Sequence, residues 1–279
     1  ILLAVVLTCF IMAKPTIDLM LAVGAMLATG ALGLFDDVTK VVQKRSLGLT
    51  PAGKMIGLTL IVCVFFVIAV NYCDVAPVIR FPGGFSIDLG ILTTTLTISG
   101  MTIDIPWLYL VFVFLLLAGM SNAVNLTDGL DGLAGGTVMI SMIVMAAVCF
   151  VCHDANLAIF CAACAGGCIG FLWFNAYPAQ IFMGDTGSLA LGGALAAVAV
   201  LTNTEVVSLV VGGLFITETL SVMIQTTYFR LTHGKRVFLM APIHHHFELK
   251  GWKETQVVVR FWIITFVLVL IGLSTLKIR

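Results

Sequence analysis

Five aspartates stand where long apolar segments meet polar loops, and they come from three separate parts of the chain. They are Asp36, Asp37, Asp128, Asp131 and Asp185. One carboxylate at such a boundary is often only a solvated helix end, but five from three loops on one membrane face favour a shared site. Adjacent carboxylates supply the oxygen ligands that Mg²⁺ prefers, and they suit a phosphate-bearing partner that shares the ion. We therefore predict an acidic centre for phosphate chemistry.

The polar run SNAVNLTDGLDGLA contains two asparagines and two aspartates at helical spacing. Asn122 and Asn125 are three residues apart, as are Asp128 and Asp131, so each pair would share a helix face. Gly129 lets the backbone approach a ligand closely. Amides and carboxylates bond the imide and hydroxyl groups of a nucleoside. The run therefore predicts a reader of a nucleobase or ribose, and a helix-breaking turn is the alternative.

The sequence around Asp185 reads Gly-Asp-Thr-Gly-Ser, which also begins the active-site loop of aspartic proteases. Those enzymes need two such loops on a soluble β fold, whereas one loop leads here into an apolar helix. An intramembrane aspartyl protease would need glycine at the position of Phe182. We therefore expect Asp185 to begin the next helix, where the helix dipole favours its ionised form.

Three consecutive histidines, His244 to His246, lie between Pro242 and Glu248 in a basic loop. The internal position argues against a tag remnant. A zinc site is disfavoured, because consecutive histidines point in different directions and no cysteine or further histidine is nearby. We interpret the triplet as donors to a diphosphate, with His245 the strongest candidate, and the basic loop raises the local anion concentration.

Two polar residues, Glu218 and Gln225, interrupt the apolar segment 206–229. Ionisable groups inside a membrane segment are functional candidates by default. For Glu218, an internal hydrogen-bonding role in a bent helix is an equally good interpretation. The sequence leaves both interpretations open.

The elements that position these residues follow from an unusual composition. Of the 279 residues, 61% are hydrophobic and 10% are charged, with a mean hydropathy of +1.15. A soluble domain carries about 25% charged residues, so most of this chain faces lipid. The formal net charge is zero, so the bulk charge says nothing about partners. We expect no nucleic-acid partner. The eight cysteines lie mostly in or beside apolar segments and predict no disulfide framework.

Nine apolar segments are candidate membrane spans, since a spanning helix needs about 20 residues. They are 1–12, 19–35, 54–71, 107–124, 133–151, 156–172, 187–202, 206–229 and 257–276. We expect an all-α polytopic integral membrane protein that forms one catalytic domain over residues 1–279.

Basic residues set the orientation of these spans. They concentrate in the loops 36–53 and 230–256, so the positive-inside rule places these loops, with 121–132 and 173–186, in the cytoplasm. Alternating apolar and polar residues at 78–105 predict a small β-hairpin on the extracytoplasmic face.

Three runs together carry a family resemblance: Asn122 to Ala134, Phe182 to Leu191 and Pro242 to Glu248. They are similar to the phospho-N-acetylmuramoyl-pentapeptide transferases, the MraY family within the polyprenyl-phosphate N-acetylhexosamine-1-phosphate transferase superfamily. The resemblance covers essentially the whole chain. The histidine triplet favours this family over relatives that use UDP-N-acetylglucosamine.

The resemblance implies transfer of phospho-MurNAc-pentapeptide from UDP-MurNAc-pentapeptide to undecaprenyl phosphate, giving lipid I and UMP in peptidoglycan synthesis. It also implies a Mg²⁺ cofactor, a bacterial plasma-membrane location with a cytoplasmic active site, ten spans and a homodimer. An N-terminal span and a cytoplasmic loop with a Pro-Thr-Met-Gly-Gly motif are expected in the family and are missing here. The alternatives are a related UDP-N-acetylglucosamine transferase and a membrane transporter, which would keep its polar residues near the bilayer midplane.

The resemblance also assigns roles to residues. Asp36, Asp37 and Asp185 would be catalytic acids, with Asp185 nearest the metal, and Phe182 would stack near the uracil. Asp36 is the candidate general base and Asp37 the electrostatic or metal support of a direct displacement at the β-phosphate. The uridine pocket would be lined by Asn125, Asp128, Gly129, Leu130 and Asp131. The other expected catalytic or substrate residues are His244, His245, His246, Asn122, Asn175, Gln225, Lys40 and Lys44.

Overall fold

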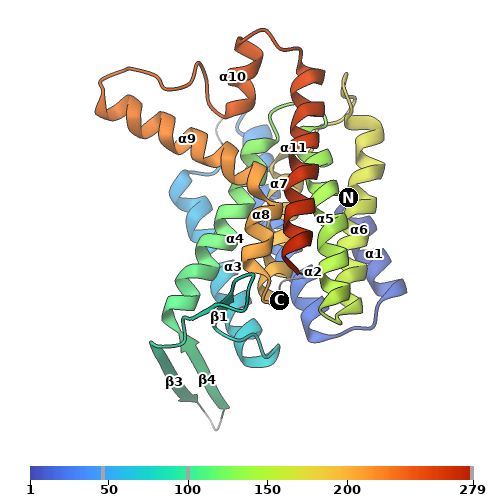
Figure 1. Cartoon of the computed structure of the whole chain (residues 1–279), viewed down its shortest axis with the longest axis vertical. Helices are drawn as coiled ribbons and strands as arrows, with labels where there is room; N and C mark the ends of the chain where they lie inside the picture. The colour runs from blue at the N-terminus through green and yellow to red at the C-terminus, as the bar shows by residue number, and fades with distance from the viewer. Residues whose placement is uncertain (45–47, 99–100, 277–279) are drawn as a thin grey trace.

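The computed structural model describes residues 1–44, 48–98 and 101–276, and it is a bundle of long helices (Figure 1). Seven helices are long and apolar enough to cross a membrane. They are α2 (Ile17–Val42), α3 (Pro51–Tyr72), α4 (Trp107–Thr127), α5 (Leu133–Val151), α6 (Ala155–Asn175), α7 (Gly184–Leu201) and α11 (Glu254–Thr275). Each coincides with one of the nine predicted spans.

The other two predicted spans are not confirmed within the described residues. Segment 1–12 forms α1 (Leu2–Met12), whose 11 residues fall short of the roughly 20 that a bilayer requires. Segment 206–229 is not one straight helix. It divides into α8 (Glu205–Val211) and α9 (Gly213–Leu231), which are bent by 75° at Gly212, so the pair counts as at most one broken span.

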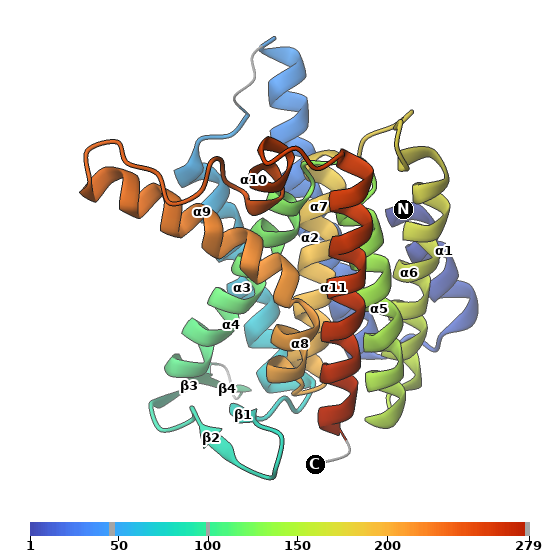
Figure 2. The same ribbon diagram turned by 45° about the horizontal axis from the view of Figure 1, so that its top comes forward.

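The bend at Gly212 directs α9 outward from the bundle, as Figures 1 and 2 both show. The chain then loops back to the short helix α10 (Ile243–Leu249), and α11 returns along the bundle. The histidine triplet therefore lies on α10 at one end of the bundle. A bent helix was one of the two interpretations left open for Glu218, but a hydropathy pattern reports how apolar a segment is and not its direction, so the position of the break was not predicted.

Two β-hairpins lie at the opposite end of the bundle from α10 (Figure 1). The sequence predicted a single hairpin over 78–105, and its extracytoplasmic location stays a prediction. Strand β1 (Val78–Arg80) pairs with β2 (Ser86–Asp88), and β3 (Thr93–Ile98) pairs with β4 (Met101–Pro106). Both pairs are antiparallel. The first turn uses Gly83 and Gly84 at φ of 89° and 82°, a conformation that favours glycine.

Small residues bring α2, α4 and α7 together, and α7 is the most enclosed of the seven long helices. A Cβ atom on Gly33 of α2 would collide with the backbone carbonyl of Asp185 at the start of α7. Gly192 of α7 lies as closely against the backbone of Met120 on α4. Such contacts are typical of helix packing in membranes, where small side chains let backbones approach. They fix the end of α2 beside the first turn of α7.

Candidate active site

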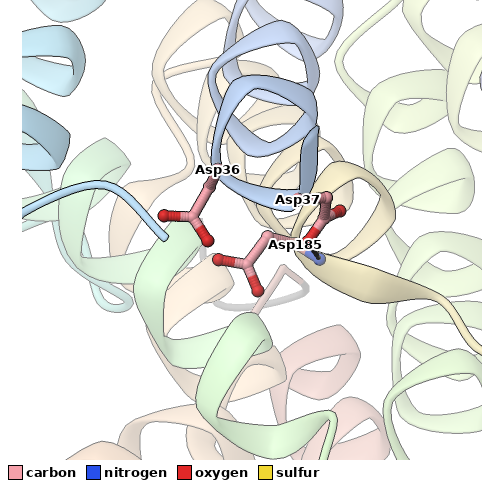
Figure 3. A group of neighbouring side chains, drawn as sticks. All are labelled: Asp36, Asp37 and Asp185. Carbon is pink, nitrogen blue, oxygen red and sulfur yellow. Dashed lines mark hydrogen bonds between the residues drawn. The ribbon is translucent and has the colours of Figure 1, made fainter. Parts of the chain in front are cut away.

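The three predicted catalytic acids come together where α2 ends and α7 begins (Figure 3). Asp36 and Asp37 lie near the end of α2, and Asp185 lies in the first turn of α7. One carboxylate oxygen from each lies within 4.8 Å of the others. Among the described residues, this is the one group of acids, histidines or cysteines with spacing suited to a metal ion.

Two lysines neutralise part of this negative charge. Lys40 Nζ lies 2.7 Å from Asp36, 3.3 Å from Asp37 and 3.2 Å from Asp185, so it contacts all three carboxylates. Lys54 Nζ lies 2.8 Å from Asp185. Three carboxylates against two ammonium groups (−3 + 2) leave a formal charge of −1.

Lys54 was not among the residues predicted from the sequence. It lies in the first turn of α3, behind the N-cap Thr50 and Pro51. A lysine at the boundary of an otherwise apolar helix is the signal that could have found it, because charged residues at that depth need a partner. The partner lies 131 residues away in sequence, and no local pattern links the two.

Asp37 and Asp36 have different surroundings although they are adjacent in sequence. Asp37 accepts hydrogen bonds from the backbone N–H of Thr186 at 3.0 Å, from the Thr186 hydroxyl at 2.8 Å and from the Asp185 N–H at 3.3 Å. It thereby caps α7 from another helix, where the dipole favours a negative charge. Asp36 is 4% exposed and accepts from the Leu49 N–H at 2.7 Å.

A cavity of about 320 Å³ adjoins the acidic centre, and Asp185 belongs to both. The exposed Phe182 ring forms part of its wall, together with Met183 and Gly184. The other lining residues were all predicted to contact substrate, namely Asn125, Asp128, Gly129, Leu130, Asp131 and Asn175. The structure therefore brings the greater part of the predicted nucleoside pocket into one place.

The cavity wall is tied together by polar side chains. Asn175 accepts from the Gly132 N–H at 3.0 Å and donates to the Ile181 carbonyl at 2.9 Å. Asp131 accepts from the Ala179 N–H at 2.9 Å. These contacts join the loop after α4 to the loop before α7. Asn125 then links the cavity to the acidic centre, because its amide donates to Asp185 at 3.0 Å.

Asp128 is the cavity residue with the most altered acidity. Burial, followed by the negative charges of Asp185 and Asp37, raises its pKa from 3.8 to about 7. No described basic side chain forms a salt bridge with it. Asp128 therefore changes charge near neutral pH, in contrast to an ordinary aspartate.

The three histidines of α10 occupy three different environments. His244 is fully buried, and its Nδ1 lies 3.1 Å from Glu218 on α9. His245 is half-buried, with its Nδ1 2.7 Å from Glu248. His246 accepts a hydrogen bond from the Leu239 N–H at its Nδ1, and burial together with Lys250 lowers its pKa. Within the described chain, no group suited to a metal includes these rings.

Four predicted substrate residues are not part of the cavity lining, and one of them, Lys40, lies in the acidic centre instead. Gln225 accepts from the N–H groups of Val237 and Phe238 and so holds their loop against α9. Asn122 donates to the carbonyl of Ala118 in its own helix. The Lys44 side chain is exposed just beyond α2.

The acidic centre fits a hard divalent cation. Its donors are carboxylate oxygens, without nitrogen or sulfur ligands, and it keeps a net negative charge. Asp37 is the least available donor, because its oxygens accept from α7. Asp36 and Asp185 are less exposed than Asp37, but each is paired with a flexible lysine side chain that a bound cation could replace.

Comparison with known proteins gives a consistent result. The Glycosyl transferase family 4 model matches residues 19–203. A phospho-N-acetylmuramoyl-pentapeptide-transferase of Neisseria meningitidis serogroup C is 46% identical over 96% of this chain and 74% of its own length. Proteins of the same name from Bacillus pumilus and Desulforapulum autotrophicum are 43% and 47% identical, over 92% and 91% of this chain and 74% and 71% of their own lengths.

Proposed function

This chain belongs to the phospho-N-acetylmuramoyl-pentapeptide transferase family, and on that premise we propose that its acidic centre and adjoining cavity form one active site. The enzyme transfers phospho-MurNAc-pentapeptide from its UDP carrier to undecaprenyl phosphate, giving lipid I and UMP for peptidoglycan synthesis. It is a multi-pass protein of the bacterial inner membrane. We place the active site on the cytoplasmic face, where a soluble nucleotide has access. The homodimer stays a prediction.

The observation that carries this proposal is the shared position of Asp185. Its carboxylate belongs to the acidic centre and also lines the 320 Å³ cavity. A UDP-sugar held with its nucleoside in the cavity would therefore direct its diphosphate to the three acids. The exposed Phe182 ring offers a stacking surface for uracil, and Asp128 and Asp131 offer acceptors for imide and hydroxyl groups.

The residues of the acidic centre divide the work of phosphoryl transfer, which depends on positioning and charge neutralisation. Asp185, with Asp36, would hold Mg²⁺, which when bound supplies neutralisation of the diphosphate charge. Lys40 and Lys54 lie within reach of the same anionic groups and orient them. Asp36 is the candidate acceptor for the remaining proton of the lipid phosphate. That phosphate is mostly ionised at neutral pH, because its second pKa is about 6.

Purified protein with undecaprenyl phosphate and each of two donors tests this proposal. UDP-MurNAc-pentapeptide should give lipid I and one UMP per turnover, while UDP-N-acetylglucosamine should give neither. Asp185→Asn should remove turnover and lower Mg²⁺ affinity, measured by calorimetry with the folded protein in the presence of UDP. Equal turnover with UDP-N-acetylglucosamine would assign the donor to the related transferases instead.

A further inference from the structure

Glu218 and His244 form a buried pair of ionisable side chains that the proposed mechanism does not use. Both side chains are 0% exposed, and the His244 Nδ1 lies 3.1 Å from a Glu218 carboxylate oxygen. A buried carboxylate or imidazolium is unfavourable without a partner, so each side chain restricts where the other can lie. The pair joins α9, which leaves the bundle, to α10, which carries the histidines.

The other ring nitrogen of His244, Nε2, contacts the loop that lines the nucleoside cavity. A Cβ atom on Gly129 would collide with His244 Nε2, so the imidazole lies directly against the Gly129 backbone. Gly129 lines the cavity between Asp128 and Leu130. His244 itself is fully buried and does not line the cavity. It therefore contacts the loop that binds the ligand, and not the ligand.

We propose that Glu218 is a positioning residue, which fixes the His244 ring and through it the 128–131 loop of the nucleotide cavity. This inference rests on the proposed function for its substrate. The three links are the Glu218–His244 contact, the His244–Gly129 contact and the place of Gly129 in the cavity wall. The His245 ring, 4.2 Å from that of His244, adds a lateral support.

The decisive variants separate a positioning role from a general loss of packing. Glu218→Ala removes the contact to His244, whereas Glu218→Gln keeps a side chain of the same length with an oxygen beside His244 Nδ1. A displaced binding loop should raise the KM for UDP-MurNAc-pentapeptide and the Kd for UMP about tenfold in Glu218→Ala. The KM for undecaprenyl phosphate should stay unchanged, and Glu218→Gln should restore most of the UMP affinity.

Two controls are available in the same chain. Glu205→Gln makes the same chemical change at another fully buried glutamate. Glu205 accepts a hydrogen bond from the Tyr109 hydroxyl at 2.7 Å, and its helix α8 lies next to the hairpin strand β1, far along the bundle from Glu218. Ser221→Ala removes a buried hydroxyl one turn from Glu218, where it bonds only the Glu218 carbonyl among the described contacts. Both should keep the UMP affinity of the unchanged protein.

A double variant tests whether Glu218 acts through His244. If it does, Glu218→Ala combined with His244→Ala should bind UMP no more weakly than His244→Ala alone, because the two losses are one and the same. Additive losses, or UMP affinity retained in Glu218→Ala, would overturn the proposal. So would an equal rise in KM for both substrates. UMP binding can be measured without turnover. If the protein without substitutions showed no transferase activity, that would count against the proposed function, and the UMP affinities of the variants would still test the positioning role.

Discussion

At the scale of single residues, the acidic centre shows how like side chains acquire unlike tasks. Asp37 accepts hydrogen bonds from the start of α7, Asp36 is buried against Leu49, and Asp185 faces both the lysines and the cavity. The chemical identity of the residue does not distinguish them. Their partners do, and each partner lies on a different segment of the chain.

Lys54 gives the first residue-scale prediction. Its ammonium group lies 2.8 Å from Asp185 and would share the charge of a bound diphosphate. Lys54→Ala should lower kcat by about 10²–10³, the effect of removing one stabilising donor from an active site. The release of UMP from the radiolabelled donor measures it. Lys14→Ala, at an exposed lysine, is the control. Similar rates for both variants would show that Lys54 has no role in catalysis.

Asp128 gives the second residue-scale prediction, which concerns how the stability of the protein depends on pH. The folded protein keeps this proton up to a pKa of about 7, whereas an ordinary aspartate releases it at 3.8. Between these values the folded state binds more protons, so the contribution of Asp128 to the free energy of unfolding falls as pH rises. Asp128→Asn should therefore raise Tm least at pH 5 and most at pH 8. A difference in Tm that is constant with pH would contradict the raised pKa.

At the scale of elements, the crossing of α2 and α7 decides whether the site exists. Gly33→Ala places a methyl group against the Asp185 backbone, and such overpacking costs about 1–3 kcal/mol. Gly24→Ala is a matched control, because it makes the same change on the same helix with no atom within 4 Å. We expect lower Tm and lower activity in Gly33→Ala only. Equal thermal unfolding curves for the two variants would show that the close contact between α2 and α7 does not contribute to stability.

The elements also show what can be predicted from the sequence. The acids and most of the pocket residues were assigned through short motifs, because each motif holds its residues at fixed local spacing. Lys54 and the Glu218–His244 pair depend on contacts between segments that no local pattern relates. Gln225 stays a prediction as a neighbour of the nucleoside. The sequence did not predict that it also holds residues 237–238, since spacing along α9 does not fix the direction in which α9 leaves the bundle.

At the scale of the whole molecule, a soluble donor and a lipid acceptor must meet at one end of a helix bundle. The acceptor phosphate is itself an anionic nucleophile, so we expect direct displacement at the β-phosphate. UMP should then appear only when undecaprenyl phosphate is present. A stoichiometric burst of UMP without acceptor, with the label retained on an aspartate, would establish a covalent intermediate and the ping-pong kinetics that accompany it.

The position of Lys40 among three carboxylates has a consequence for the timing of ion entry. Because it is four residues from Asp36 on the same helix, its ammonium group is a tethered counter-ion at high local concentration. A free divalent cation has to compete with this tether and should bind weakly by itself. A diphosphate gives Lys40 a second anion to pair with and brings its own oxygens to the ion. The centre should therefore admit metal and nucleotide together, which shields it from other cations between turnovers.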